Sequence, residues 1–233
     1  MSSVGPVALI TGRVGLWCWS SRHPDWHPGQ FGAEVVSFLA RTDHAVVAID
    51  PLLPAEPSPE LLGLLDREVS ASGRLVIAIT IGYHVRSAEL LWQHYRDQAE
   101  VVICGPKTVP AKLGAAATAF VNLPTGEPGP AGLVAQAIGN PRRSEAPLYL
   151  PDRRALVFGD AVVGGPAGPV IWSQRPLNEP VLRFHRRRFN PSLAPLLDLE
   201  FDHLLLTHGP SVIGNGREAL ARAIAADPWY HRG

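Results

Sequence analysis

A strand, helix and strand pattern over residues 74–105 constrains the fold of this chain more than any other feature. Residues 74–80 (RLVIAIT) are a short apolar run typical of a buried strand, and residues 101–105 (VVICG) are a second one. Between them, residues 87–98 have the apolar spacing of a helix. Two strands joined in this way lie parallel in one sheet. The pattern therefore predicts an α/β fold.

Other apolar runs predict further strands, and two leucine- or alanine-rich segments predict helices at 59–73 and 216–227. The further strands are expected at 7–11, 15–19, 34–40, 44–50, 117–123, 132–138, 146–151, 155–165, 169–173 and 203–209. Residues 176–195 are rich in Pro and Arg and are predicted to be irregular. Because no shift in composition marks a boundary, we expect one domain over residues 1–233 with a mixed sheet architecture.

The composition excludes several classes of protein. Lys plus Arg and Asp plus Glu are both 21, so the formal net charge is zero, which argues against nucleic acid or an anionic membrane as a partner. There is no apolar run long enough to span a membrane and no convincing signal peptide. The two cysteines form no motif, so we expect a reducing, cytoplasmic setting. A small-molecule ligand is the expected partner, and oligomer formation stays open.

Polar residues with catalytic or metal-binding chemistry stand at the ends of the predicted strands. Asp50, Asp160 and His208 each end an apolar run, and the run 74–80 leads into a turn that contains His84. An α/β domain commonly builds its site from such strand ends. Imidazole nitrogen and carboxylate oxygen together suit zinc and similar ions. Taken singly, each residue is also explained as a turn former, a helix cap or a hydrogen-bonded structural histidine.

Three segments together resemble the metallo-β-lactamase superfamily: AVVAIDP at 45–51, LVFGDAVVG at 156–164 and DHLLLTHGPSVIGNGREAL at 202–220. The resemblance extends over about residues 7–226. It implies an αβ/βα sandwich, in which two mixed β-sheets are flanked by helices. It also implies a two-metal site, usually of zinc, at one edge of the sandwich, where a water is activated for hydrolysis.

The chain departs from that family at most of the ligand positions. The family signature Thr-His-x-His-x-Asp-His begins at Thr80 in direct register, and its ligand positions are occupied by Ile81, Tyr83, Val85 and Arg86. His84 lies one position away from a ligand position. No histidine stands where the family has its next ligand, and Glu145 is nearest to that place. Asp50, Asp160 and His208 are the matching residues that remain.

Two hypotheses follow from this comparison. In the first, the degenerate site holds little or no metal and binds a small anionic ligand through Tyr83, Arg86 and Glu145, with Asp160 and Arg86 as the candidate catalytic groups. In this case the guanidinium of Arg86 replaces the charge of the metal. Substitution Arg86→Ala is then expected to weaken anion binding or to destabilise the fold. Enzymatic activity is left open.

In the second hypothesis, the protein is a metal-dependent hydrolase. One divalent ion, zinc or iron, is held by His84, Asp160 and His208, and Asp50 supports these ligands from behind. This requires the turn at Gly82 to shift so that His84 faces the site. A third, structural possibility is a scaffold that forms an oligomer.

Two other segments have weaker functional interpretations. His23, Asp25 and His27 have a spacing that suits a metal, but the neighbouring prolines oppose a helix, so we expect a loop at the rim of the pocket with Trp26 at its mouth. Residues Arg183–Phe189 form the single basic run, which we interpret as a solvated or partner-facing strip.

Overall fold

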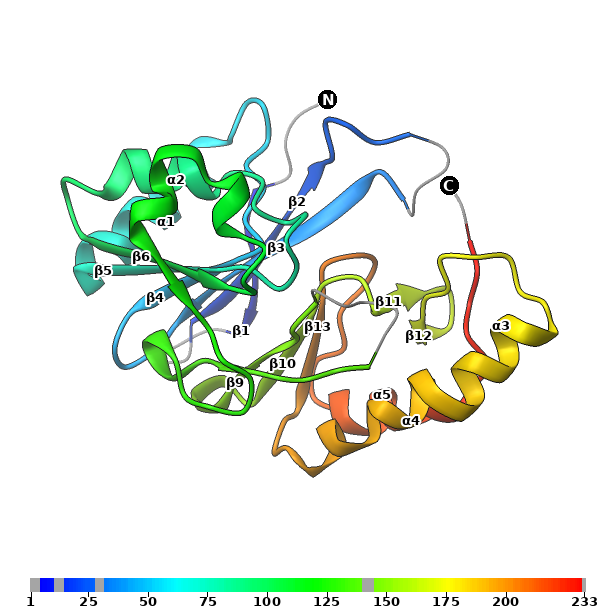
Figure 1. Ribbon diagram of the computed structural model, residues 1–233. Helices are drawn as coiled ribbons and strands as arrows, with labels where there is room; N and C mark the ends of the chain where they lie inside the picture. The colour runs from blue at the N-terminus through cyan, green and yellow to red at the C-terminus, as the bar shows by residue number, and fades with distance from the viewer. Residues whose placement is uncertain (1–4, 11–14, 28–31, 140–144, 232–233) are drawn as a thin grey trace.

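Two β-sheets lie face to face at the centre of the molecule, and helices cover their outer sides (Figure 1). The computed structural model describes residues 5–10, 15–27, 32–139 and 145–231. The predicted α/β class and the sandwich of two mixed sheets are confirmed.

The first sheet has seven strands in the order β1-β2-β3-β4-β5-β6-β7. They are β1 (Val7–Ile10), β2 (Leu16–Arg22), β3 (Glu34–Arg41), β4 (Val46–Ile49), β5 (Arg74–Ala78), β6 (Glu100–Gly105) and β7 (Phe120–Asn122). Neighbouring strands are antiparallel from β1 to β4 and parallel from β4 to β7. Two helices, α1 (Pro59–Ser72) and α2 (Ala88–Tyr95), pack on its outer face. The crossover predicted from residues 74–105 is therefore confirmed as β5–α2–β6.

The second sheet has four strands in the order β13-β10-β9-β8, and a two-stranded hairpin, β11–β12, follows β10 in the chain. The strands are β8 (Val134–Ala135), β9 (Leu148–Leu150), β10 (Ala155–Phe158), β11 (Val162–Gly165), β12 (Gly168–Ile171) and β13 (His203–Leu206). Helix α5 (Gly216–Ala225) and the segment of α3 (Glu179–Phe184) and α4 (Asn190–Ser192) cover its outer face.

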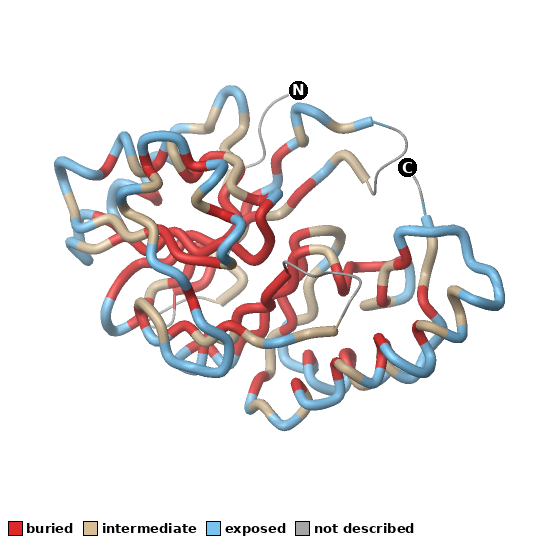
Figure 2. Tube along the Cα trace, viewed as in Figure 1, coloured by how far each residue is buried: buried red, intermediate tan, exposed pale blue. Residues whose placement is uncertain are grey.

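The strands at the centre are apolar on both faces because both faces are covered. In β4, Val47 and Ile49 face the second sheet, whereas Val46 and Ala48 face α1 and α2. The same alternation holds in β5, β10 and β13. Figure 2 shows the buried segments concentrated along these central strands. The loops that leave their ends are thus fixed by a rigid base.

The prediction of irregular structure over residues 176–195 is wrong. Helix α3 (Glu179–Phe184) continues through a π-helical turn at His185–Phe189 into α4 (Asn190–Ser192). The side chain of Asn178 caps the start of α3. Pro180 stands in the first turn of α3, where a missing N–H is tolerated, whereas Pro191 and Pro195 stand at the starts of α4 and of the 3₁₀ segment Ala194–Asp198.

Smaller differences concern the boundaries of elements. The predicted strand 117–123 is shorter, because Gly114–Ala119 is a 3₁₀ segment and only Phe120–Asn122 is extended. Of the predicted strand 7–11, Thr11 lies outside the described residues. Further 3₁₀ turns occur at Pro110–Lys112, Pro130–Gly132, Pro151–Arg153 and Ala194–Asp198. Among the helices in the described parts of the chain, none combines the length and the apolar character that a membrane crossing requires.

Candidate metal centre

Asp50 is the buried anchor of the site. It follows β4 with a φ of 45°, in the left-handed region that few residues other than glycine adopt. Its Oδ1 accepts a hydrogen bond of 2.8 Å from the Thr80 backbone N–H, and its Oδ2 accepts one from the Thr80 hydroxyl. Its backbone oxygen accepts a hydrogen bond of 2.9 Å from the hydroxyl of Ser37. The carboxylate is thereby turned toward the end of β5.

His84 lies in the turn after β5, and both nitrogens of its ring face carboxylates. Nδ1 lies 2.8 Å from Asp50 Oδ2, and Nε2 lies 3.4 Å from Asp160 Oδ1. The backbone N–H of His84 donates to Ile81 O at 2.8 Å, which tightens the turn. Because only 4% of His84 is exposed, the ring is held within the protein rather than in solvent.

Asp160 and His208 come from the ends of neighbouring strands in the second sheet. Asp160 follows β10, His208 follows β13, and these two strands pair in parallel. His208 Nε2 lies 3.3 Å from Asp160 Oδ1. The Gly164 N–H donates to His208 O at 2.7 Å, which fixes the backbone that carries the imidazole.

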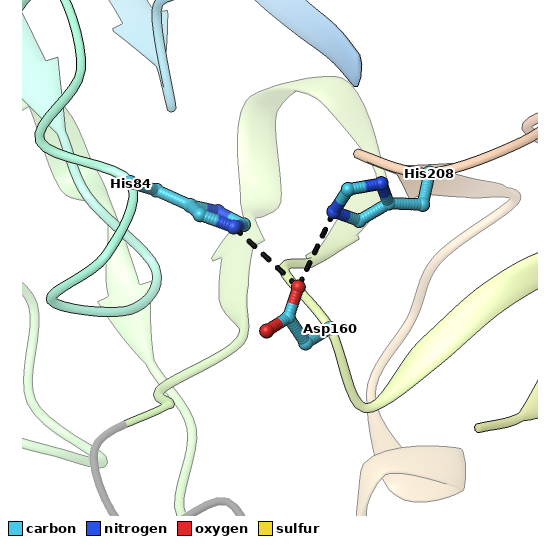
Figure 3. A group of neighbouring side chains, drawn as sticks. All are labelled: His84, Asp160 and His208. Atoms are coloured by element: carbon cyan, nitrogen blue, oxygen red, sulfur yellow. Dashed lines mark ion pairs between the residues drawn. The ribbon is translucent and has the colours of Figure 1, made fainter. Parts of the chain in front are cut away.

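His84, Asp160 and His208 form the compact group drawn in Figure 3. Each of the three offers one possible ligand atom, and these atoms all lie within 4.8 Å of one another. Figure 3 shows the two imidazoles directed at the same oxygen of the Asp160 carboxylate. Two imidazole nitrogens and one carboxylate oxygen are a donor set that zinc or iron accepts. The group therefore has the chemistry of a site for one metal ion.

Charges in this group shift one another's pKa. Burial raises the pKa of Asp160, but hydrogen bonds with His208 and His84 outweigh it and hold that pKa well below its usual range. Burial and Arg86 lower the pKa of His84, yet Asp50 and Asp160 outweigh them, so the net shift is upward. Burial lowers the pKa of His208 in spite of Asp160. Asp160 thus favours the ionised form and His208 the neutral form, which are the forms that bind metals, whereas the upward shift favours the protonated form of His84.

Arg86 brings a cation beside the two carboxylates. Its φ of 37° is again in the left-handed region, and its Nη1 donates to Asp50 O at 3.2 Å. Its Nε is buried and has no hydrogen-bond partner among the described residues. Burial lowers the pKa of its guanidinium, and Asp50 and Asp160 oppose that effect. A guanidinium nevertheless stays charged at neutral pH.

A cleft with a volume of about 300 Å³ opens over this group. Its lining includes His84, Asp160 and His208 together with Arg86, and its walls add His23, Trp26, Gly32, Val35, Tyr83, Trp172 and Gln174. The Tyr83 side chain is at the rim, with 66% of the residue exposed and Lys112 Nζ 4.5 Å from its ring centre.

Other residues singled out in the sequence lie in different surroundings. The Glu145 carboxylate accepts hydrogen bonds from backbone N–H groups of residues 159–161. His23 and Trp26 line the cleft, whereas the Asp25 backbone N–H donates to His23 Nδ1 at 3.2 Å. The run Arg183–Phe189 belongs to α3 and the π-helical turn, on the outer face of the second sheet.

Thr80 and Thr207 contribute to the site without having been singled out in the sequence. Thr80 binds Asp50, and Thr207 Oγ1 donates to Gly159 O at 2.5 Å, next to Asp160. Thr80 lies two residues after the end of β5 and Thr207 directly follows β13, so position near a strand end was the available signal. Trp172 and Gln174 were missed as well, because their place on the cleft depends on how the β11–β12 hairpin folds back.

No protein-family model and no curated protein sequence matches the chain. Solved structures do match. DIM-1 metallo-β-lactamase exposed to ceftazidime is 10% identical, with a TM-score of 0.61 over 97% of this chain and 99% of that one. The mono-zinc form of FIM-1 metallo-β-lactamase from Pseudomonas aeruginosa is 12% identical, with a TM-score of 0.56 and 96% of each chain covered. The chemotaxis sensor ODP, solved as a peroxy diiron species, is 13% identical, with a TM-score of 0.58 over 97% and 96%.

These matches span nearly the whole chain and therefore establish its architecture. Their sequence identities are too low to establish its chemistry. The resemblance noted in the sequence is thus confirmed at the level of the fold: this chain has the metallo-β-lactamase fold.

Proposed function

We propose that the protein is a metal-dependent hydrolase that holds a single divalent ion, zinc or iron, at His84, Asp160 and His208. One observation carries the proposal: the Nε2 atoms of both histidines face the same carboxylate oxygen, while Asp50 holds the other nitrogen of His84. His84 would supply a ligand that is absent when the chain is aligned directly with the family signature.

The donor set fits such an ion for two reasons. Its three groups are typical ligands of zinc and iron and lie close enough to share one ion. In addition, a ligating histidine in a metal site almost always donates its second ring N–H to an oxygen, and Asp50 is placed to accept from His84 Nδ1. This contact leaves Nε2 as the coordinating nitrogen. When bound, the ion would supply Lewis-acid chemistry to a substrate in the cleft.

One ion is favoured over two. At the signature positions, Ile81 is a buried apolar residue and Tyr83 is exposed at the rim. The carboxylate of Glu145 is directed at backbone N–H groups. Ile81, Tyr83 and Glu145 therefore offer no ligand set for a second metal ion. A solved neighbour, FIM-1, is described in a mono-zinc form, which shows that the fold accommodates one zinc in that protein.

The chain's own residues suggest an anionic substrate. Arg86 presents a cation on the wall of the cleft, and a guanidinium binds carboxylate or phosphate groups through paired hydrogen bonds. We assign Arg86 to substrate binding and charge stabilisation, Tyr83 to contact at the rim, and Asp160 to the catalytic centre itself. The cleft is about 300 Å³, which suits a small molecule.

A second candidate is a metal-free protein that binds a small anion. The specific observation in its favour is Arg86, whose cationic group already lies beside Asp50 and Asp160. In that case Arg86 takes the place of a metal charge, and Tyr83 completes the ligand site. Arg86→Ala is then expected to abolish binding of inorganic phosphate, whereas Arg222→Ala, at an exposed position of α5, leaves binding unchanged.

Metal analysis distinguishes the two candidates. Untagged protein is purified without chelator, supplied with zinc or iron(II), desalted and assayed by mass spectrometry for bound metal. We expect one equivalent in the wild type and in the control His44→Ala, which alters an exposed turn, and loss of the ion in His84→Ala and His208→Ala. Absence of a stoichiometric ion from the wild type would refute the hydrolase proposal and leave the anion-binding candidate.

A further inference from the structure

Glu145 is a buried carboxylate that is directed at the backbone of one turn of the chain. Only 5% of the residue is exposed. Its Oε1 accepts hydrogen bonds from the N–H groups of Gly159, Asp160 and Ala161 at 3.0, 3.2 and 3.2 Å. Its Oε2 accepts a second one from Ala161 at 2.9 Å. Three successive amides thus converge on one side chain, and the middle one belongs to Asp160.

The same turn is also held from its other sides. The Thr207 hydroxyl donates to Gly159 O at 2.5 Å. A Cβ atom on Gly159 would lie 2.5 Å from Thr80 Oγ1, so this glycine allows the turn to approach the end of β5 closely. The Ala146 N–H donates to Thr80 O at 2.8 Å, which places the Glu145 segment at the same junction. The turn therefore meets residues from both sheets.

We infer that Glu145 is a positioning residue that fixes the carboxylate of Asp160 between His84 and His208. The expected effect of Glu145 on metal affinity rests on the proposed function, a single-ion site. The hydrogen bonds of Glu145 do not depend on any ion. In the sequence, Glu145 stands nearest to the position of a metal ligand of the family. Here it acts instead through the backbone N–H of Asp160.

A carboxylate suits this role better than an amide. Hydrogen bonds to a charged acceptor are about twice as strong as those between neutral groups, and Glu145 offers two acceptor oxygens to the turn. In Glu145→Gln one acceptor oxygen and the charge are lost, so the turn is held less firmly. In Glu145→Ala all four of these hydrogen bonds are lost. The two variants should therefore form a graded series.

Glu68 offers a matched control. It is also buried, at 2% exposure, and its carboxylate accepts hydrogen bonds from Arg41 and Arg67 on the outer side of the first sheet. Substitution Glu68→Ala removes a buried carboxylate and destabilises the protein without touching the turn at 159–161. An effect specific to Glu145→Ala is thus separated from general loss of stability.

The experiment measures zinc affinity by competition with a chromogenic chelator, together with thermal stability. Loss of a residue that orients a ligand typically lowers metal affinity about 10- to 100-fold. We expect a loss of this size in Glu145→Ala, a smaller loss in Glu145→Gln and wild-type affinity in Glu68→Ala. If the wild type binds zinc and Glu145→Ala binds it equally well, or if Glu68→Ala weakens binding as much, the inference is overturned.

A second readout needs no metal and separates this inference from the proposed function. In the metal-free protein, we expect Glu145→Ala to accelerate hydrogen exchange over residues 159–161 and to change the imidazole ¹⁵N shifts of His84 and His208. Glu68→Ala should leave both unchanged. Unaltered exchange and shifts in Glu145→Ala would overturn the inference, whereas failure of the wild type to bind zinc contradicts only the proposed function.

Discussion

At the scale of single residues, Asp50 connects a strained backbone to the candidate metal centre. A residue with a positive φ outside glycine costs free energy and is kept where its surroundings hold it in place. Here the bonds from Thr80 and His84 to its carboxylate supply that support. The orientation of His84 thus depends on a carboxylate that no solvent reaches.

Substitution Asp50→Asn tests this dependence. Asparagine tolerates the same backbone conformation. Its amide nitrogen, however, is a donor and would replace an oxygen that accepts hydrogen bonds from Thr80 and His84. A buried, mismatched group of this kind costs about 1–3 kcal/mol. We expect that decrease in the free energy of unfolding, measured in urea, together with weaker zinc binding. Asp97→Asn, at an exposed position, should change neither quantity.

At the scale of elements, the loops that follow β5, β10 and β13 form the candidate site, and the sequence predicted much of this arrangement. Asp160 and His208 lie at the ends of paired strands, as their positions after apolar runs indicated. His84 could not be placed from the sequence, because its direction depends on a turn in which Arg86 has a positive φ. The helix over 179–192 was missed, because its prolines were interpreted as breaks.

A close contact between two glycines fixes the loop after β13. Gly209 has a φ of 74°, and a Cβ atom there would lie 2.2 Å from Gly164 O. We expect Gly209→Ala to lower the free energy of unfolding by more than about 1 kcal/mol, since a left-handed residue with a side chain costs about 1–2 kcal/mol before any clash. Because the loop carries His208, zinc affinity should fall as well.

Gly63→Ala is the control for this prediction and has the opposite sign. Gly63 lies within α1, and nothing comes within 4 Å of a Cβ placed there. Alanine should stabilise the helix by about 0.5–1 kcal/mol. If Gly209→Ala proved as stable as Gly63→Ala in thermal denaturation, the close contact would not constrain the loop.

At the scale of the whole molecule, the core between the two sheets determines which groups solvent can reach. Cys104 in β6 belongs to this core, and burial raises the pKa of its thiol to about 12. Burial also raises the pKa of Cys18, which is partly exposed. The apolar runs that build this core were evident in the sequence, whereas the depth of each thiol was not, because it depends on how the sheets stack.

Thiol reactivity therefore reports on separation of the sheets. At pH 8 we expect Cys104 to be inert toward Ellman's reagent in the native protein, and both thiols to react in guanidinium chloride. Above pH 9 the unfolded thiol ionises while the folded one retains its proton, so the free energy of unfolding should decrease as the pH rises toward 12. Rapid labelling of native Cys104 at pH 8 would contradict this description of the core.

The candidate ligands come from both sides of the sandwich, since His84 follows a strand of the first sheet and Asp160 and His208 follow strands of the second. An ion held by all three would act as a cross-link between the two sheets. Its binding free energy would then also oppose their separation, by about 2.7 kcal/mol at a concentration 100 times the dissociation constant. Occupancy of the site and resistance of the two sheets to separation would therefore be thermodynamically linked, so that either one could be measured to report on the other.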